Sequence, residues 1–445
     1  MADDRWSAGH RAGLGRRAGG SLMVVMAGAA VVDITPPPGL QMAGFGARTE
    51  PAKGTHDPLT VRALAVDDTA IVVADIIGMD DELSRRVREA CVLPAERVVI
   101  TALHNHGGPA VERGPGSQPV DADYTRRLEA ALVAAIDRAV AAQRPATLSM
   151  GMGEDPDVGR NRRHEGGIVD RALPELRVRG EDGKVLAVLV SYACHPVTLS
   201  ADNLLWTADY PHYVRTGIEA AYPGAIAVFA TGCCGDVNTG HSAYASQTLS
   251  SYSDRTFERA EQLGRRIADA AVLAPEIPVN GPVVASDVMV DVALRRRETA
   301  PLPDLAERWA AEAKAHPERA TLLTHWVGWA RKWNGSPVDG SWAGRVSALV
   351  WAGVPIVALP GEIFTETALS VRAALGDAPA FVLELADASP GYIPPRSEFA
   401  FGGYEVEEAH RYIGMPGAFA PGAAEKLAEA ACALLRKEAA PDDAF

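Results

Sequence analysis

The sequence predicts a fold of the α/β or mixed α+β class, because strand-like and helix-like segments alternate along its 445 residues. Residues 98–103 are all apolar or β-branched, which is typical of a buried strand. Residues 124–143 instead place apolar side chains four positions apart, from Leu128 to Val140, as a helix with one buried face does. The composition, 47% hydrophobic and 22% charged, is that of an ordinary globular protein.

The N-terminal half is expected to form a series of short strands interrupted by three helices. Its predicted strands are 31–34, 59–66, 70–75, 98–103, 147–152, 175–179, 185–192 and 225–230. Turns at 67–69 and 181–183 join two pairs of them into hairpins. Its predicted helices are 80–91, 124–143 and 207–222. The clearest of them is capped by Asp121 or Asp123 and ends before Pro145.

The C-terminal half continues the alternation with longer helices. Its predicted helices are 256–273, 302–333, 362–375 and 422–437, and its strands 283–294, 344–351, 354–359 and 381–385. One helix carries Trp326, Trp329 and Trp333 at helical spacing. Such a stripe more often packs into a core than forms a platform for a ligand, and both interpretations stay open here.

Charge and composition exclude several kinds of partner. The net charge of −14 disfavours nucleic acid and anionic lipid surfaces, because both need clustered cations on the protein. No segment is long enough to span a bilayer, and five cysteines without framework spacing favour a reducing compartment. We therefore expect a cytoplasmic protein that acts on a small-molecule substrate and has no stable membrane anchor. Whether it forms a homo-oligomer is left open.

Several predicted strands end at a polar residue beside Gly or Pro. His104 and His106 follow the strand 98–103, His195 follows 185–192, and Glu362 follows 354–359. In an extended segment residues i and i+2 face the same side, so His104 and His106 would point together. Two histidines and a glutamate are a common zinc set that leaves a position for water. The alternative is that each residue caps its own loop, and spacing alone does not decide between the two.

The loop 158–164 is basic within an acidic protein and contains Arg160, Arg162 and Arg163. It is either a solvated turn or a clamp for an anion or a carbonyl group, for which guanidinium groups are well suited.

Short motifs follow one another in a fixed order between residues 27 and 410. They are Ala-Gly-Ala-Ala-Val-Val-Asp-Ile-Thr-Pro-Pro (27–37), Thr-Ala-Leu-His-Asn-His-Gly-Gly-Pro (101–109), Gly-Arg-Asn-Arg-Arg (159–163), Ala-Cys-His-Pro-Val-Thr-Leu (193–199), Ala-Asp-Tyr-Pro (208–211), Gly-Asp-Val-Asn (235–238), Leu-Pro-Gly-Glu (359–362) and Gly-Tyr-Ile-Pro-Pro-Arg-Ser-Glu-Phe (391–399). This ordered set resembles the N-terminal catalytic domain of the neutral/alkaline ceramidase family. No single motif is specific, but the ordered set is.

The resemblance implies two mixed β-sheets flanked by helices, with a metal site at the carboxyl ends of strands. It implies a zinc ion held by His104, His195, Glu362 and Tyr392. It further implies that His106 orients the substrate, that Arg162 contacts the carbonyl group or the oxyanion formed from it, and that Tyr404 is a second active-site tyrosine.

The chain departs from the family pattern at several positions. Asn238 stands where ceramidases carry a serine proposed to take part in catalysis, Arg163 stands where the family has serine, and Ser389 where tyrosine is common. We expect a disordered extension over 1–26 and a single catalytic domain over 27–440, without the immunoglobulin-like domain of ceramidases. A helical, tryptophan-rich insert at about 300–342 interrupts the family motifs and is a candidate specificity element.

These observations lead to one preferred function and two alternatives. The preferred function is zinc-dependent hydrolysis of an amide bond in a small N-acylated compound by metal-activated water, with His106, Arg162 and Tyr404 as catalytic residues. The alternatives are a zinc hydrolase of an ester or glycoside-like substrate and a non-catalytic, ceramidase-like binding protein.

Overall fold

The computed structural model describes residues 23–439 except 112–119, 248–251, 338 and 377. Most of the N-terminal extension expected over 1–26 lies outside the described residues. Strand β1 begins at Val25, so the first described element starts two residues before the domain boundary predicted at residue 27. No helix in the described ranges combines the length and the apolar character that a bilayer crossing requires.

The larger sheet is curved and has eight main strands in the order β11-β9-β8-β6-β1-β3-β4-β5. They are β1 (Val25–Asp33), β3 (Thr60–Val66), β4 (Thr69–Ala74), β5 (Val98–Ala102), β6 (Arg144–Gly153), β8 (Leu173–Gly180), β9 (Val185–Tyr192) and β11 (Ile226–Thr231), and β13 (Ile277–Pro278) also pairs with β6. The pairs β11–β9 and β4–β5 are parallel, whereas the others are antiparallel. The two predicted hairpins, β3–β4 and β8–β9, are confirmed.

The smaller sheet has the strand order β18-β16-β15-β14-β20. Its strands are β14 (Val283–Arg295), β15 (Asp339–Trp351), β16 (Val354–Ala358), β18 (Phe381–Leu383) and β20 (Ala418–Phe419). Only β16 and β18 are parallel, so this sheet is mixed as well. The predicted pair of mixed sheets is therefore confirmed.

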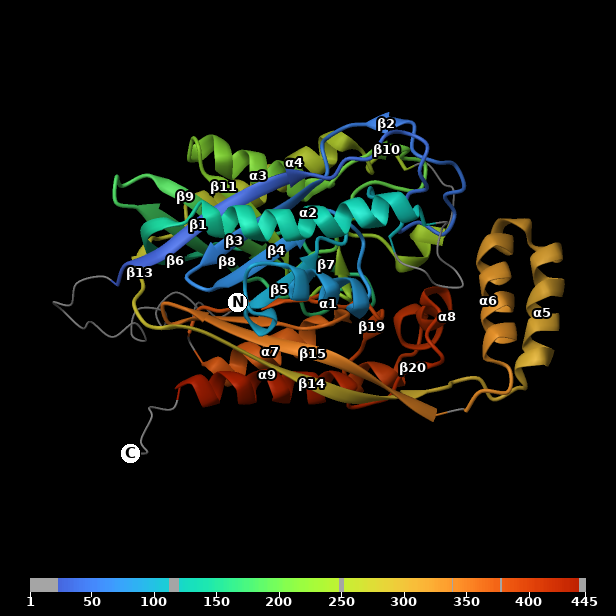
Figure 1. The fold of residues 1–445 in the computed structure, drawn as a ribbon. Coiled ribbons are helices and arrows are strands. Elements are labelled where there is room, and N and C mark those ends of the chain that lie inside the picture. Colours follow the sequence, from blue (N-terminus) through green and yellow to red (C-terminus); the bar gives the residue numbers. More distant parts are fainter. Residues whose placement is uncertain (1–22, 112–119, 248–251, 338, 377, 440–445) are drawn as a thin grey trace, which may run out of the picture.

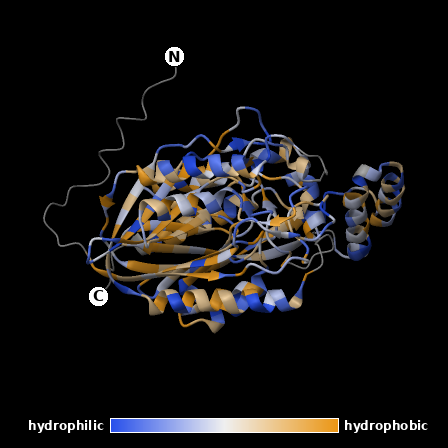
Figure 2. Cartoon of the chain, turned by 90° about the horizontal axis from the view of Figure 1, so that it is seen from above, coloured by the Kyte–Doolittle hydropathy of each residue, from blue (hydrophilic) through white to orange (hydrophobic). Residues whose placement is uncertain are grey.

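Helices cover the outer faces of the two sheets, so the molecule has a helix–sheet–sheet–helix order of layers (Figure 1). The helices are α1 (Asp81–Ala90), α2 (Ala122–Ala141), α3 (Tyr210–Ala221), α4 (Phe257–Val272), α7 (Thr365–Leu375), α8 (Ala409–Ile413) and α9 (Ala423–Ala439), with α5 and α6 described below. Helix α2 packs on β1 and β3, α4 on β6 and β8, and α9 on β14 and β15. Figure 2 shows largely hydrophobic strands and helices with mixed surfaces, as burial of one helix face requires.

The last residue of β18 and the residues directly after it close the open side of the larger sheet. Leu383 forms an isolated bridge with Gly232, which follows β11, and Ala386 forms one with Thr101 of β5. One short stretch of chain thus contacts both end strands of the sheet. It also belongs to the smaller sheet through β18, so both sheets meet at this place.

The single helix predicted over 302–333 is wrong. The chain forms two helices, α5 (Leu302–Ala315) and α6 (Ala320–Trp333), because Pro317 disfavours helical backbone at His316, where ψ is 78°. The two helices form a hairpin at one end of the molecule (Figure 1). Trp326 and Trp329 are buried in the hairpin's own core, which confirms the packing interpretation of the tryptophan stripe.

The predicted helix start at Glu362 is also wrong. Glu362 and Ile363 form β17, a two-residue strand parallel to β19 (Tyr392–Ile393), and α7 begins only at Thr365. Two further pairs are as short: β2 (Gly54–Thr55) with β10 (Leu205–Trp206), and β7 (Arg160–Asn161) with β12 (Val237–Asn238). Such pairs depend on long-range contacts, so a helix-like local pattern did not reveal β17.

Candidate metal centre

Three side chains from distant elements converge where the two sheets meet. His104 follows β5, His195 follows β9, and Glu362 lies in β17. The Nε2 atoms of His104 and His195 lie 3.2 and 3.1 Å from Glu362 Oε2. All three residues are buried, and their ligand atoms lie within 4.8 Å of one another. The structure therefore brings together three of the four residues expected to hold a metal.

The two imidazoles are oriented by backbone carbonyl groups. His104 Nδ1 is 2.6 Å from the carbonyl oxygen of Ile77, and His195 Nδ1 is 2.6 Å from that of Cys234. A carbonyl oxygen only accepts, so each Nδ1 carries a proton and each ring turns its Nε2 toward Glu362. Such carbonyl partners are typical of histidines that bind metals.

The donor set fits zinc. Glu362 Oε2 lies 3.1 Å from one Nε2 atom and 3.2 Å from the other, and all three atoms can donate a lone pair to a cation bound between them. Atoms bound to a tetrahedral zinc at about 2.0–2.1 Å lie about 3.3 Å apart, close to these spacings. Two imidazoles and one carboxylate are also a donor type that zinc accepts.

The charges in the cluster are strongly coupled. Burial lowers the pKa of His195 to about 4, and nearby Arg162 adds to this effect. Burial acts in the same direction on His104, but Glu362 outweighs it and raises the pKa of His104 above its ordinary value. Against the effect of burial, the two histidines hold the pKa of the Glu362 carboxyl well below its usual range. The Glu362 carboxyl is thus held in its ionised form, the form that binds a cation.

The geometry at His104 differs from the expected extended strand. Strand β5 ends at Ala102, and His104 has a φ of 69°, which is uncommon for a residue other than glycine. The rings of His104 and His106 therefore do not point side by side as the i, i+2 argument predicted. They meet edge to face, with centroids 5.3 Å apart.

Tyr392 lies directly beside Glu362, because the two residues are register partners in the β17–β19 pair. Its hydroxyl oxygen accepts a hydrogen bond of 3.0 Å from Arg162 Nη2, and its ring stacks near that of His195 at 6.4 Å. Burial raises the pKa of Tyr392, with Glu362 acting in the same direction. Tyr392 thus lies beside the candidate ligands, and its role as a fourth ligand stays a prediction.

His106 lies on the other side of His104. Its ring packs against Phe45 with centroids 4.8 Å apart, and neither ring nitrogen has a hydrogen-bond partner among the described residues. Gly44, with a φ of +99°, passes so close that an added Cβ would lie 2.3 Å from His106 Cγ. Burial, reinforced by His104 and His195, holds the pKa of His106 well below its ordinary value. His106 is therefore a neutral imidazole with unpartnered nitrogens next to the cluster.

Arg162 lies beneath Tyr392 and is almost fully buried. Its Nε donates to Glu405 Oε1 at 3.0 Å, and its Nη2 donates to the carbonyl oxygen of Gly235 at 2.9 Å and to Tyr392. Nη1 takes part in none of these hydrogen bonds and is the remaining donor group of this guanidinium. Arg162 and Arg163 of the basic loop are therefore part of the candidate site, whereas Arg160 lies at the surface.

Sequence reasoning missed Glu405, which holds two arginines. Its Oε2 accepts from Arg163 Nη1 at 2.6 Å, while Arg163 Nε donates to Glu398 at 2.8 Å. Glu405 lies in a π-helical turn, Tyr404–Glu408, that also places the Tyr404 ring 5.9 Å from the Tyr392 ring. The sequence did contain a signal for Glu405. It is an acidic residue directly after the candidate active-site residue Tyr404, in a chain that also has the adjacent pair Arg162 and Arg163.

The Gly-Asp-Val-Asn loop braces the site without entering the ligand set. Asp236 accepts from the backbone N–H of Thr365 at 2.8 Å and from the Asn161 side chain at 2.9 Å. Asn238 Oδ1 accepts from the N–H groups of Gly240 and His241, and its Nδ2 donates to the His241 carbonyl oxygen. Both side chains hold loops.

Comparison with known proteins identifies the architecture. No protein-family model matches the sequence, and neither does any curated protein. Among solved structures, neutral ceramidase from Pseudomonas aeruginosa matches with a TM-score of 0.71 and 16% sequence identity, over 94% of this chain and 75% of that chain. The chain has the fold of a neutral ceramidase. A ceramidase structure described as complexed with C2 gives a TM-score of 0.70 and 16% identity, over 94% of this chain and 76% of that chain.

These matches confirm the predicted resemblance at the level of the fold. They span almost the whole described chain, so both sheets are included in the ceramidase-like fold. At 16% identity they do not transfer the activity, which has to rest on the site itself.

A second group of candidate ligands lies behind His195 in the ceramidase-like fold. It consists of His195, Cys234 and Glu384, whose ligand atoms also lie within 4.8 Å of one another. These atoms already have hydrogen-bond partners: His195 Nδ1 bonds the Cys234 carbonyl oxygen, and Cys234 Sγ donates to Glu384 Oε1 at 3.0 Å. Burial raises the pKa of Glu384 to about 8. This group supports the first one and does not form a separate metal site.

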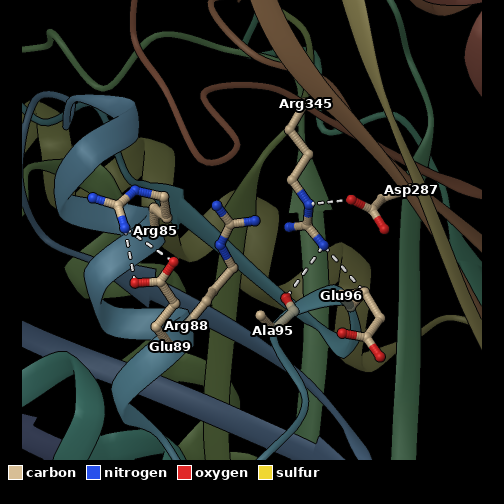
Figure 3. Close-up of a pocket in the computed structure, with 7 residues that line it drawn as sticks. All are labelled: Arg85, Arg88, Glu89, Ala95, Glu96, Asp287 and Arg345. Atoms are coloured by element: carbon tan, nitrogen blue, oxygen red, sulfur yellow. Dashed lines mark hydrogen bonds and ion pairs between the residues drawn. The ribbon is translucent and has the colours of Figure 1, made fainter.

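A pocket of about 210 Å³ lies away from the metal centre, between α1 and β14 (Figure 3). It is lined by Arg85, Arg88, Glu89, Ala95, Glu96, Asp287 and Arg345. Arg85 pairs with Glu89, and Arg345 pairs with Asp287 at 2.8 Å. These cations are thus neutralised by acidic neighbours, and the pocket offers no group suited to amide chemistry.

Proposed function

We propose that the protein is a zinc-dependent hydrolase that cleaves a linear amide bond in a small N-acylated compound. The observation that carries this proposal is the convergence of His104 Nε2, His195 Nε2 and Glu362 Oε2, with both Nδ1 atoms held by backbone carbonyl groups. Zinc bound by these residues, with Tyr392 as a fourth ligand, would polarise a carbonyl group and make water acidic enough to attack it.

Three residues of the chain supply the other functions that amide hydrolysis needs. The Nη1 group of Arg162 donates to the substrate oxygen as negative charge develops on it, and Tyr404 helps to stabilise that charge. His106 is neutral and has unpartnered ring nitrogens, so it accepts a proton and transfers it to the leaving amine.

Water is the nucleophile in this proposal. Asn238, at the position of the family's serine, has no hydroxyl group, and its amide is bonded within its own loop. The α5–α6 hairpin packs against Tyr412 of α8, and the ring of Tyr412 also lies beside Gly46. This position fits a role of the hairpin in substrate selection. The likeness to ceramidases supports an N-acyl substrate, whose chain length is left for a screen to determine.

The test combines metal analysis with a substrate screen. Purified protein is expected to contain close to one zinc per chain and to hydrolyse N-acyl amines of some chain length. The His195→Ala variant should lose both zinc and activity, whereas His316→Ala, which changes an exposed histidine, should keep both. Full zinc occupancy in His195→Ala would contradict the ligand assignment. Zinc binding without amide turnover, but with ester or glycoside turnover, would assign a different hydrolase reaction to the same site.

A further inference from the structure

Glu384 occupies a special place in the fold. It lies in the segment that bridges β11 and β5, between the two residues that form the bridges, Leu383 and Ala386. Its backbone N–H donates to the carbonyl oxygen of Thr231 at 3.2 Å, and its side chain is fully buried. Burying a carboxyl group costs free energy of folding unless hydrogen bonds compensate for the lost water. The hydrogen-bond partners of Glu384 therefore indicate its role.

The carboxyl group contacts the segment that carries Glu362 and the segment that orients His195. Its Oε2 accepts from the N–H of Ile363 at 2.8 Å, and Ile363 follows the ligand Glu362. The same Oε2 accepts from the N–H of Cys234 at 3.2 Å. The carbonyl oxygen of Cys234 is the acceptor that orients His195 through its Nδ1 at 2.6 Å.

These backbone groups need a side-chain partner because of the local topology. Strand β17 has two residues and, among the described strands, pairs with β19 alone, and the N–H of Ile363 donates to Glu384. Cys234 lies in the loop after β11. One carboxyl oxygen of Glu384 replaces the missing strand partner for both segments.

We infer that Glu384 is a positioning residue that fixes the distance between Glu362 and His195 and thereby preorganises the zinc site. This inference rests on the proposed zinc site. Glu384 is not a ligand here, because its oxygens accept from Ile363, Cys234 and the Cys234 thiol, and His195 presents its Nε2 to Glu362. Groups that hold metal ligands in this way typically change metal affinity about 10–100-fold when they are removed.

Two substitutions separate the reach of the side chain from its ability to titrate. Glu384→Gln keeps an oxygen at the same distance from the backbone and removes the titratable group. Glu384→Asp keeps a carboxyl group but is one methylene shorter, so its oxygen no longer reaches both N–H groups. Glu175→Asp is the matched control, since Glu175 is also a buried glutamate and lies in β8, outside the site.

The measurement is the rate at which a colorimetric chelator removes zinc from each purified, zinc-loaded protein. We expect zinc loss from Glu384→Asp to be about 10–100-fold faster than from the unsubstituted protein. Glu384→Gln and Glu175→Asp should stay within about threefold of it, because they keep the two hydrogen bonds to Ile363 and Cys234.

Equal rates for all four proteins, or faster loss from Glu384→Gln alone, would overturn the inference. Failure of the unsubstituted protein to bind zinc would instead refute the proposed function, and the inference with it.

Discussion

Replacing Glu405 by glutamine should destabilise the protein more than any exposed carboxylate substitution. Glu405 bonds Arg162 through Oε1 at 3.0 Å and Arg163 through Oε2 at 2.6 Å. The three side chains are 3%, 4% and 7% exposed, so solvent screens these pairs little. Glutamine has nearly the same size, which means that the substitution removes the charge and little else.

The structure sets the expected magnitude. Removing one partner of a buried ion pair costs about 3–5 kcal/mol, because the other charge stays buried without compensation. Arg163 keeps Glu398 at 2.8 Å, whereas Arg162 keeps only the neutral oxygens of Gly235 and Tyr392. Only Arg162 loses its sole carboxylate partner. We therefore expect the free energy of unfolding to fall by an amount near the lower limit, about 3 kcal/mol.

The assay is urea unfolding followed by tryptophan fluorescence, with Glu366→Gln as control. Glu366 is an exposed carboxylate on α7, so its substitution should change the free energy of unfolding by less than about 0.5 kcal/mol. Glu405→Gln should also lower the catalytic rate, because Arg162 is no longer held beside Tyr392. A loss below about 1 kcal/mol would show that Glu405 does not hold the arginine pair as the geometry indicates.

Three further predictions concern other regions. Gly44→Ala should displace His106 and lower kcat about 100-fold, with an unchanged circular dichroism spectrum. The control is Gly39→Ala, which is also at positive φ but has nothing within 4 Å of the added Cβ, and it should keep its kcat. Equal kcat values for the two variants would contradict the contact between Gly44 and His106. Trp329→Ala should lower the free energy of unfolding by about 3–5 kcal/mol, because Trp329 is fully buried and its Nε1 donates to the carbonyl oxygen of Met415. A change under about 1 kcal/mol would exclude that packing. His410 and Arg411 outweigh the effect of burial and lower the pKa of Glu298 from 4.5 to about 2. The ionised carboxylate therefore stabilises the fold fully above about pH 4.5, and this stabilisation is lost as the pH falls through about 2. The stability difference between the unsubstituted protein and Glu298→Gln should therefore shrink by about 3 kcal/mol from pH 6 to pH 2, and a difference independent of pH would refute it.

The sequence was sufficient for the elements whose pattern is local. The hairpins β3–β4 and β8–β9, the helix α2 and the mixed sheets follow from periodicity, turn residues and the ordered motifs. The same motifs selected His104, His195 and Glu362, which the structure brings together.

The errors have identifiable causes. Pro317 was visible in the sequence, but the apolar periodicity on both sides of it suggested one continuous helix. Strand β17 depends on pairing with Tyr392, and no local pattern encodes that contact. Glu384 and Glu405 act through partners from other elements, so their environment became visible only in three dimensions.

The bridging of β5 and β11 by residues 383–386 has a consequence for how the protein folds. Glu362 and His195 are separated by 167 positions, and the bridging segment is made later still in synthesis. Until it docks, both end strands of the larger sheet expose edges that can pair with other chains. We expect assembly to be slow and to depend on chaperones, because closure requires contacts of high sequence separation. A metal ion would bind only the form in which residues 383–386 have docked, because the ligands come together only there. Metal binding would therefore shift the docking equilibrium toward the folded protein.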